Sequence, residues 1–412
     1  MGLRRWFVPL STLLALSGFA FFGHLIVLAA ELPEQRSVDD MPIVQATAPP
    51  ADVIELQPSP DGEWEAVLNK AAGSLDVTDK HGESHPLFPA GSDVTAMCWS
   101  PDSTRLLVVR PYYEFDQEHG TLLNAARPIE IWQARLLEQR VQPPTLLYSA
   151  SREEFERDGA QQVIFGKWSP NSRYVVMWVG MLSASILADG LPPFVLDADT
   201  GQAHPIAMDS SAGRPALELS PDNVALANPR YHSWSPDGSR LAITAGGYRS
   251  AQVNKWLNLV EVETGQATTV ISKTEQIPGI VAWSPRGDVI AYAAVPAEQT
   301  GDQWADGMTF DNPAIAGRRV YLLDPATGQH RRLNAVESYQ DAPVWSFDGG
   351  RLYYVQRDGD FLYLMAADPT TGLAGPVSGA KQPVDLGDPA RPAVGYYGQF
   401  GREELLEQIP DR

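Results

Sequence analysis

The chain has 412 residues, a formal net charge of −20 at pH 7 and one cysteine, Cys98. The acidic balance repels phosphate backbones and argues against nucleic-acid binding, while a single cysteine excludes an internal disulfide and a CxxC-type metal site. Cys98 itself is expected to be a small buried hydrophobe beside Trp99 rather than a reactive thiol.

Two arginines at positions 4 and 5 precede a long uncharged stretch. Residues 6–30 carry no charged side chain and are long enough to cross about 30 Å of hydrocarbon. Because the arginines precede this stretch and acidic residues follow it, the pattern predicts a transmembrane signal-anchor over residues 1–30, with the rest of the chain outside the cytoplasm. The alternative is a signal peptide cleaved after residues 28–30, which would leave a secreted or periplasmic protein. Residues 31–52 contain four prolines and are predicted to be an extended linker.

A short sequence motif, Trp-Ser followed by turn residues, recurs through the rest of the chain. We call it the Trp-Ser phrase. Repetition at a spacing of tens of residues indicates one structural unit per copy. In the copy at residues 234–238, proline fixes the second turn position, aspartate can bond its own backbone, and glycine tolerates the exit. An earlier copy at Ser59 lacks the tryptophan. The tryptophans of the phrase are Trp99, Trp168, Trp234, Trp283 and Trp345.

A second turn, usually Thr-Gly, follows most copies of the phrase, as at Gly201, Gly265, Gly328 and Gly372. Between the turns, apolar and polar residues alternate as in short strands, so each unit reads as a four-stranded antiparallel meander. The units run over residues 53–90, 91–150, 160–208, 225–273, 278–334 and 338–378.

A single four-stranded sheet leaves both of its faces uncovered, and sheets stacked radially about an axis cover one another. The predicted fold is therefore all-β: a six-bladed β-propeller over residues 53–380, in which the repeat tryptophans pack between adjacent blades. Residues 220–223 resemble a decayed repeat and leave seven blades as the alternative.

The last segment, residues 381–412, is predicted to be a C-terminal tail. Residues 395–398 suit an edge strand that would close the ring, and residues 403–408 suit a short helix. Pairing of residues 43–46 with the last blade is the alternative route to ring closure.

The ordered pair of turns resembles the WD40-like (PD40) repeat of TolB-type β-propellers, whose consensus is Trp-Ser-Pro-Asp-Gly followed by a Thr-Gly turn. The resemblance covers roughly residues 53–378 and implies the propeller fold. TolB-type proteins carry an additional mixed domain ahead of the propeller, where this chain has only residues 31–52, so it is not expected to be TolB itself. The same repeat forms the propeller of prolyl-oligopeptidase-like enzymes, for whose α/β-hydrolase domain the chain has no room.

Two connections between second and third strands are longer than the others, and long loops on a rigid scaffold commonly carry binding sites. They cover residues 110–128 in the second unit and 295–318 in the fifth. In a six-bladed ring these units stand opposite each other, so the insertions would flank one mouth of the central channel. Their aromatic and carboxylate side chains suit cationic peptides or sugars; the alternative is that the loops fold back and pack on the blades. The predicted ligand-binding residues are Tyr112, Tyr113, Glu114, Asp116, Asp302, Trp304 and Asp306.

The sequence motifs of several common enzyme classes are missing from the chain. It contains no Gly-x-Ser-x-Gly, His-Glu-x-x-His, Walker or Gly-x-Gly-x-x-Gly pattern. No cofactor or metal is predicted, because His81 and His85 fall around a turn without evident carboxylate partners. Residues 302–311 are acidic without EF-hand spacing, which leaves weak calcium binding open.

The expected function is a non-catalytic extracytoplasmic propeller, tethered to a membrane, that binds an unidentified protein, peptide or glycan on the face bearing the insertions. One alternative is a hydrolase or lyase that uses carboxylates at the channel mouth, such as Glu114, Asp116, Asp302 and Asp306. Another alternative is a structural subunit of an envelope complex, with its contacts on the blade sides.

Overall fold

The computed structural model describes most of the chain between residues 54 and 384, together with a short C-terminal segment. All of it belongs to one compact unit, residues 48–412. The predicted membrane anchor and linker lie outside the description, and no helix among the residues inside it is long and apolar enough to cross a membrane. The described residues are 54–116, 121–137, 140–150, 162–180, 191–206, 225, 230–246, 254–299, 310, 312–384 and 403–410.

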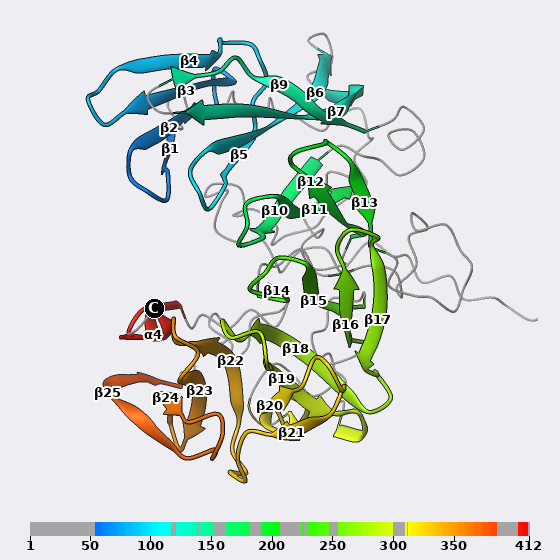
Figure 1. The fold of residues 1–412 in the computed structure, drawn as a ribbon, viewed down its shortest axis with the longest axis vertical. Helices are drawn as coiled ribbons and strands as arrows, with labels where there is room; N and C mark the ends of the chain where they lie inside the picture. The colour runs from blue at the N-terminus through cyan, green and yellow to red at the C-terminus, as the bar shows by residue number, and fades with distance from the viewer. Residues whose placement is uncertain are drawn as a thin grey trace, which may run out of the picture. The chain divides into compact units, whose positions relative to one another are not determined.

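Six antiparallel sheets follow one another along the chain (Figure 1). In each sheet the strands pair in chain order, so every sheet is a meander, and the second has an additional strand. The predicted all-β organisation in six repeating units is therefore confirmed. The first three sheets comprise β1 (Ile54–Pro58), β2 (Trp64–Asn69), β3 (Ser74–Asp79) and β4 (Ser84–Phe88); β5 (Ala96–Trp99), β6 (Arg105–Asp116), β7 (Thr121–Leu137), β8 (Arg140–Val141) and β9 (Thr145–Ser149); and β10 (Gln162–Trp168), β11 (Tyr174–Gly180), β12 (Pro193–Asp197) and β13 (Ala203–Pro205). The last three comprise β14 (His232–Trp234), β15 (Arg240–Ala245), β16 (Trp256–Glu261) and β17 (Gln266–Ile271); β18 (Gln276–Trp283), β19 (Ile290–Pro296), β20 (Arg319–Leu323) and β21 (His330–Arg332); and β22 (Gln340–Trp345), β23 (Leu352–Asp358), β24 (Phe361–Ala367) and β25 (Ala374–Pro383).

The second sheet departs from the four-stranded pattern because its outer strand is split. β8 pairs with the end of β7 at Leu136 and Leu137, whereas β9 pairs with residues 130–133 of the same strand. Pro143 and Pro144 lie between β8 and β9, and proline cannot donate to a strand ladder. The two short strands together therefore take the place of one outer strand.

The turns between first and second strands are held by a recurring hydrogen bond. The serine Oγ donates to the side-chain oxygen two residues later, at 2.6 Å in four turns and 2.7 Å in the last. In the fifth sheet Arg286 replaces the aspartate, and Ser284 Oγ accepts the Arg286 N–H instead. The serines of the other turns are Ser59, Ser100, Ser169, Ser235 and Ser346.

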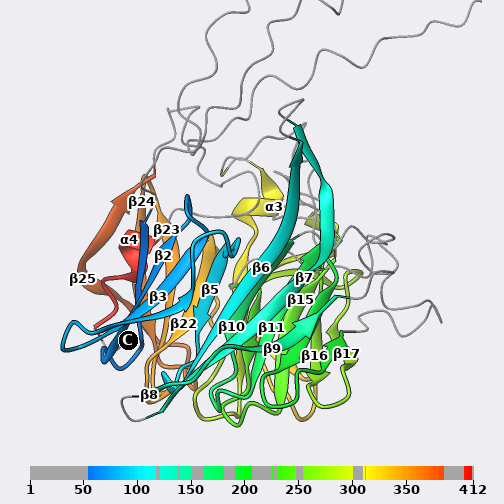
Figure 2. The ribbon, with the colours of Figure 1, turned by 90° about the horizontal axis from the view of Figure 1, so that it is seen from above.

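Neighbouring turns of the first three sheets are also tied to each other. The backbone N–H of Asp61 donates to Ser103 Oγ, and that of Asp102 donates to Ser172 Oγ. Because each sheet is a meander, its second-to-third-strand connection lies at the opposite end. We call the end with the serine turns the turn end. The insertion end is the opposite end, where β6 stops at Asp116, β7 starts at Thr121 and β20 starts at Arg319. Figure 2 shows the hairpin tip and α3 (Pro313–Ala316) on the same side.

The repeat tryptophans lie between the sheets, as the sequence predicts. Each is 6–8% exposed, and four of the five indole N–H groups donate to the first strand of the preceding sheet. Trp234, for example, donates to the carbonyl of Lys167 at 2.9 Å. Trp283 is the exception, because its indole donates to Gly287 in its own turn at 3.3 Å.

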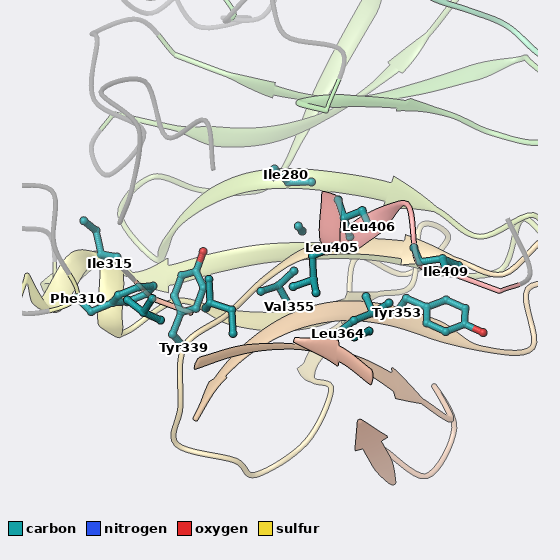
Figure 3. Close-up of a cluster of buried hydrophobic side chains, with 14 of the residues drawn as sticks. Ile280, Phe310, Ile315, Tyr339, Tyr353, Val355, Leu364, Leu405, Leu406 and Ile409 are labelled. Atoms are coloured by element: carbon teal, nitrogen blue, oxygen red, sulfur yellow. The ribbon is translucent and has the colours of Figure 1, made fainter. Parts of the chain in front are cut away.

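Buried apolar side chains fill the space between successive sheets. One cluster joins each neighbouring pair, from the first and second sheets to the fifth and sixth. The remaining face of the sixth sheet is covered by Leu405, Leu406 and Ile409, which lie on and just after α4 (Glu403–Leu406) and belong to the same cluster as Tyr353 (Figure 3). Meanders packed face to face in chain order are the arrangement of β-propeller blades.

The features that the sequence proposes for ring closure are not part of this description. Residues 43–46, residues 395–398 and the repeat fragment at 220–223 all lie outside the described residues. Among the residues that are described, no apolar cluster joins the sixth sheet to the first. The number of blades beyond the six sheets and the mode of closure therefore stay predictions.

Candidate functional site

The predicted ligand-binding residues fall largely outside the side chains that the structure describes. Tyr112, Tyr113, Glu114 and Asp116 lie on β6, of which only the backbone is described at these positions. Asp302, Trp304 and Asp306 lie outside the described residues. Their role in binding stays a prediction, and the site below is built from other side chains of the insertion end.

The first insertion is a strand extension, so the prediction of a long loop over residues 110–128 is wrong. Tyr112 pairs with Arg127, and Asp116 pairs with Thr121 near the hairpin tip. Pro111 lies at a register shift next to Tyr112. A proline is compatible with a strand at such a bulge, because no ladder hydrogen bond is required of it there. β6 and β7 therefore continue as a hairpin beyond the sheet (Figure 2).

Phe310, in the second insertion, is a packing residue. It is 4% exposed and stands edge-on to Tyr339, with the ring centres 4.8 Å apart. The guanidinium of Arg357 lies 4.7 Å from the centre of the Phe310 ring. Figure 3 shows Phe310, Ile315 and Tyr339 gathered at one end of a buried cluster. For this residue, the alternative that the loop folds back onto the blades is the one found.

A pocket of about 290 Å³ lies beside these rings. Its lining includes Phe310, Tyr339 and Arg357, together with the acidic residues Glu337 and Asp358. An arginine 2.6 Å from the carboxylate of Glu337 holds the pKa of that residue below its ordinary value. The pocket therefore combines buried aromatic rings with charges of both signs.

Tyr339 connects this pocket to a buried ion pair. Its hydroxyl donates to Asp341 Oδ2 at 3.2 Å, and Arg318 Nε lies 3.0 Å from the same oxygen. The side chains of Arg318 and Asp341 are each 1% exposed. Burial alone would lower the pKa of Arg318, but the neighbouring carboxylate outweighs burial and raises that pKa, so the guanidinium stays charged.

Three sheets contribute to the surroundings of this guanidinium. Tyr231 directly precedes β14 of the fourth sheet, Gly279 lies in β18 of the fifth, and Tyr339 and Asp341 lie at the start of β22 in the sixth. A Cβ on Gly279 would overlap Nη2 of Arg318, so this position needs a residue without a side chain. We call Arg318, Asp341, Tyr231, Tyr339 and Gly279 the Arg318 cluster.

The Arg318 cluster holds more hydrogen-bond donors than acceptors. Arg318 Nε is paired with Asp341, but Nη1 and Nη2 form no hydrogen bond with a described residue, and the Tyr231 hydroxyl likewise has no partner among them. Burial raises the pKa of Tyr231 to about 12, so its hydroxyl keeps its proton at neutral pH. The acceptor Asp341 is already engaged, since its Oδ1 accepts the Ala342 N–H at 2.7 Å. Buried donors without acceptors are uncommon and costly in native proteins.

The backbone next to Asp341 is strained. Ala342 has φ of 53°, in the left-handed region that is unfavourable for residues with a side chain. The register of β22 against β23 shifts between Asp341 and Val344, and such a bulge changes the direction of nearby side chains. Backbone strain of this kind recurs at ligand-binding sites.

Sequence reasoning missed the Arg318 cluster because its members are far apart in the chain and carry no shared motif. The one local signal is Asp341 itself. It lies within the strand segment that leads into Trp345, where a buried carboxylate requires a partner.

The structure also corrects the expectation that the histidines of the first unit lack carboxylate partners. Asp79, Glu83 and His85 have potential ligand atoms within 4.8 Å of one another. Asp79 Oδ1, however, already accepts the backbone N–H groups of His81 at 2.8 Å and Glu83 at 2.9 Å. These bonds, chiefly the one from Glu83, lower the pKa of Asp79. The carboxylate is thus explained as the cap of the β3–β4 turn.

Comparisons with known proteins give similar solved structures but no family. No family model and no curated protein matches the chain. A crystal structure of TolB from Acinetobacter baumannii matches at 13% identity and a TM-score of 0.33, over 78% of this chain and 62% of that one, so the chain spans less than two thirds of its length. An oligogalacturonate lyase in complex with manganese matches at 14% identity and a TM-score of 0.43, over 80% and 76% of the two chains. The Dos1 propeller matches at 10% identity and a TM-score of 0.44, over 79% and 71%.

Proposed function

We propose that this chain is a non-catalytic propeller that binds a protein, peptide or glycan at its insertion end. The observation that most directly supports the proposal is the Arg318 cluster, whose buried donors have no acceptor among the described residues. Such donors require a partner that the described part of the protein does not supply. The pocket beside Phe310 shares Tyr339 with this cluster, which gives a ligand further surface at the same end.

We also propose an extracytoplasmic location, with residues 1–30 as a membrane anchor and a cleaved signal peptide as the alternative. The support is the uncharged stretch that follows Arg4 and Arg5. In cells with an exposed inner membrane, external protease should digest the propeller while the protein sediments with membranes. Release into the soluble fraction would favour the cleaved alternative, and full protection from protease would contradict the proposed location.

The insertion aromatics provide the test of ligand binding. Replacing Tyr112, Tyr113 and Trp304 with alanine in the full chain should abolish capture of the ligand by in-cell crosslinking. Thermal stability should change little, because residues that serve recognition contribute little to packing. A large loss of stability would instead identify these aromatics as packing residues.

Phe347 is the matched control for this experiment. It is an aromatic residue that is 86% exposed, and it belongs to a serine turn at the opposite end of the sheets. Phe347→Ala should leave capture unchanged. Loss of capture in this variant, or crosslinks confined to the blade sides, would contradict binding at the insertion end; the second result would favour a structural subunit.

A panel of glycans and peptides separates binding from catalysis. The proposal predicts no turnover by the purified full chain. Turnover that is lost on Glu114→Gln or Asp306→Asn would contradict it and would establish the hydrolase or lyase alternative.

A further inference from the structure

We infer that the ligand presents a carboxylate group, which the Arg318 cluster binds through the guanidinium of Arg318 and the hydroxyl of Tyr231. This inference rests on the proposed function, because it names the chemistry that is recognised at the insertion end. It predicts a specific ligand class from contacts within the described residues.

The geometry of the donors is the first argument. A guanidinium offers five N–H donors in a planar fork, and Asp341 approaches that of Arg318 at Nε. Nη1 and Nη2 are left without hydrogen-bond partners among the described residues. A carboxylate places two oxygens in one plane and binds such a fork through two parallel hydrogen bonds. The Tyr231 hydroxyl, which also has no described partner, supplies a further donor.

The number of acceptors is the second argument. A single carbonyl or hydroxyl oxygen from a neutral ligand would engage one arm of the fork and leave other donors buried and unsatisfied. Asp341 faces Nε of Arg318 and also accepts from Ala342 and Tyr339, and it leaves Nη1 and Nη2 without a hydrogen bond to a described residue. A ligand group with two oxygens removes most of this deficit.

Charge selects a carboxylate over a phosphate. Asp341 already balances Arg318, so an incoming anion adds net negative charge to a buried site. A carboxylate adds one charge, whereas a phosphate monoester adds about 1.5–2 at neutral pH. One further arginine lies close by, since Arg357 contacts the Phe310 ring that packs on Tyr339.

The residues around Arg318 leave space for its guanidinium and hold it in position. Gly279 provides the space that Nη2 of Arg318 occupies, since any Cβ there would overlap this nitrogen. The left-handed Ala342 and the bulge of β22 fix the backbone beside Asp341. A guanidinium that is fully buried and positioned from three sheets has the preorganisation that recognition requires.

Thermal unfolding of the detergent-purified full chain tests the inference, with sodium acetate as the probe and sodium chloride at equal ionic strength as the reference. Acetate should raise the midpoint in a saturable manner, because it binds the folded state. Tyr231→Phe should weaken the apparent acetate affinity about tenfold, which is the effect of losing one hydrogen bond to a charged group. Phosphate at the same ionic strength should bind more weakly than acetate.

Two further variants control for folding. Tyr292→Phe removes a hydroxyl that is equally buried but donates to Gln276 at 2.8 Å, and it should keep the wild-type acetate affinity. Arg318→Gln combined with Asp341→Asn removes both charges together and should abolish the acetate response. If this double variant fails to fold, the comparison of Tyr231→Phe with Tyr292→Phe still decides.

The inference is overturned if acetate gives no saturable shift, if Tyr231→Phe binds acetate as well as the wild type, or if phosphate binds more tightly than acetate. Ligand capture that depends on Tyr112, Tyr113 and Trp304 but survives the Arg318→Gln/Asp341→Asn change would leave the proposed function standing. Loss of all capture at the insertion end would contradict the proposed function instead. The two failures are thus distinguished.

Discussion

The two ends of the sheets treat their polar groups differently. At the turn end, Ser235 Oγ donates to Asp237 at 2.6 Å, and the same bond recurs in four other sheets. Arg105, which follows such a turn, has Nη2 2.6 Å from Asp199, and its Nη1 is buried without a hydrogen bond to a described residue. At the insertion end, Arg318 pairs with Asp341 only through Nε, and both Nη1 and Nη2 lack hydrogen bonds to described residues.

This difference separates stability from recognition within one scaffold. Groups that are paired inside the protein stabilise it but are unavailable to a ligand, whereas buried unpaired donors destabilise it until an acceptor arrives. In most sheets the repeated serine turns supply polar groups that are paired inside the protein. The Arg318 cluster brings several buried donors without described acceptors together in one place.

The largest expected effect is at the insertion end. Asp341→Ala should lower the free energy of unfolding by about 3–5 kcal/mol, because it leaves the Arg318 guanidinium buried without its counter-charge. Arg318→Met combined with Asp341→Leu should recover most of that loss, since neither charge remains. Denaturant unfolding measures both variants. A double variant as unstable as the single one would show that the ion pair stabilises the fold. The insertion end would then not differ from the turn end in this respect.

The glycines of the second turns test the turn end. Gly82 and Gly201 have φ of 84° and 76°, but only at Gly201 would a Cβ meet another sheet, at the carbonyl of Leu147. Gly82→Ala should cost about 1–2 kcal/mol from backbone strain, and Gly201→Ala should cost clearly more. Equal losses in denaturant unfolding would mean that the turns do not contact the neighbouring sheet as described.

The turn aspartates should make stability depend on acid pH. The Ser235 hydroxyl, followed by the Ser239 N–H and hydroxyl, holds the pKa of Asp237 below its ordinary value of 3.8. A carboxyl with a lowered pKa contributes stability above 3.8, and the contribution is lost as pH falls through the lower folded value. Asp237→Asn should therefore be mildly destabilising at pH 7 and nearly neutral at pH 2.

The third sheet offers a natural control for this prediction, because Asn171 occupies the same turn position and accepts the same bond from Ser169 at 2.6 Å. Asn171→Asp should add acid sensitivity where Asp237→Asn removes it. Unfolding free energies at pH 2 and pH 7 measure both. An unchanged pH dependence in the two variants would contradict the assignment.

The last prediction concerns a rate and not stability. Cys98 lies between the second and third sheets and accepts the indole N–H of Trp168 at 3.1 Å. Burial raises the pKa of its thiol to about 11, so only about one molecule in a thousand is a thiolate at pH 8. Alkylation by iodoacetamide, followed by mass spectrometry, should be about a hundredfold slower than for a free thiol. Modification at the rate of a free cysteine would show that this space between the sheets is open.

Sequence reasoning recovered the turn end because its contacts are local and repeated. Ser235 forms hydrogen bonds with residues within five positions of itself. The local sequence is therefore sufficient to predict the turn. The inter-sheet position of Trp234 followed from the Trp-Ser phrase, since an apolar ring that recurs once per unit must be buried between units. Only the covering of the outer face of the sixth sheet by the segment around Leu405 could not be anticipated from the repeats.

The insertion end could not be predicted in the same way. Tyr231, Gly279, Arg318 and Asp341 belong to three different sheets and meet only after these have packed. The strand extension of β6 was also hidden, because Pro111 reads as a strand breaker unless the bulge at that position is known. Aromatic and acidic composition pointed to the insertions, whose role in binding stays a prediction, and it gave no sign of the buried Arg318.

The central claim is that the Tyr231 hydroxyl is a buried donor without a partner among the described residues. The unfolding free energies of Tyr231→Phe and Tyr292→Phe test it most directly. In the absence of any ligand, Tyr292→Phe should lose about 1 kcal/mol because it breaks the bond to Gln276. Tyr231→Phe should lose nothing or become more stable. A loss in Tyr231→Phe as large as that in Tyr292→Phe would show that the hydroxyl is already satisfied, and would contradict the account.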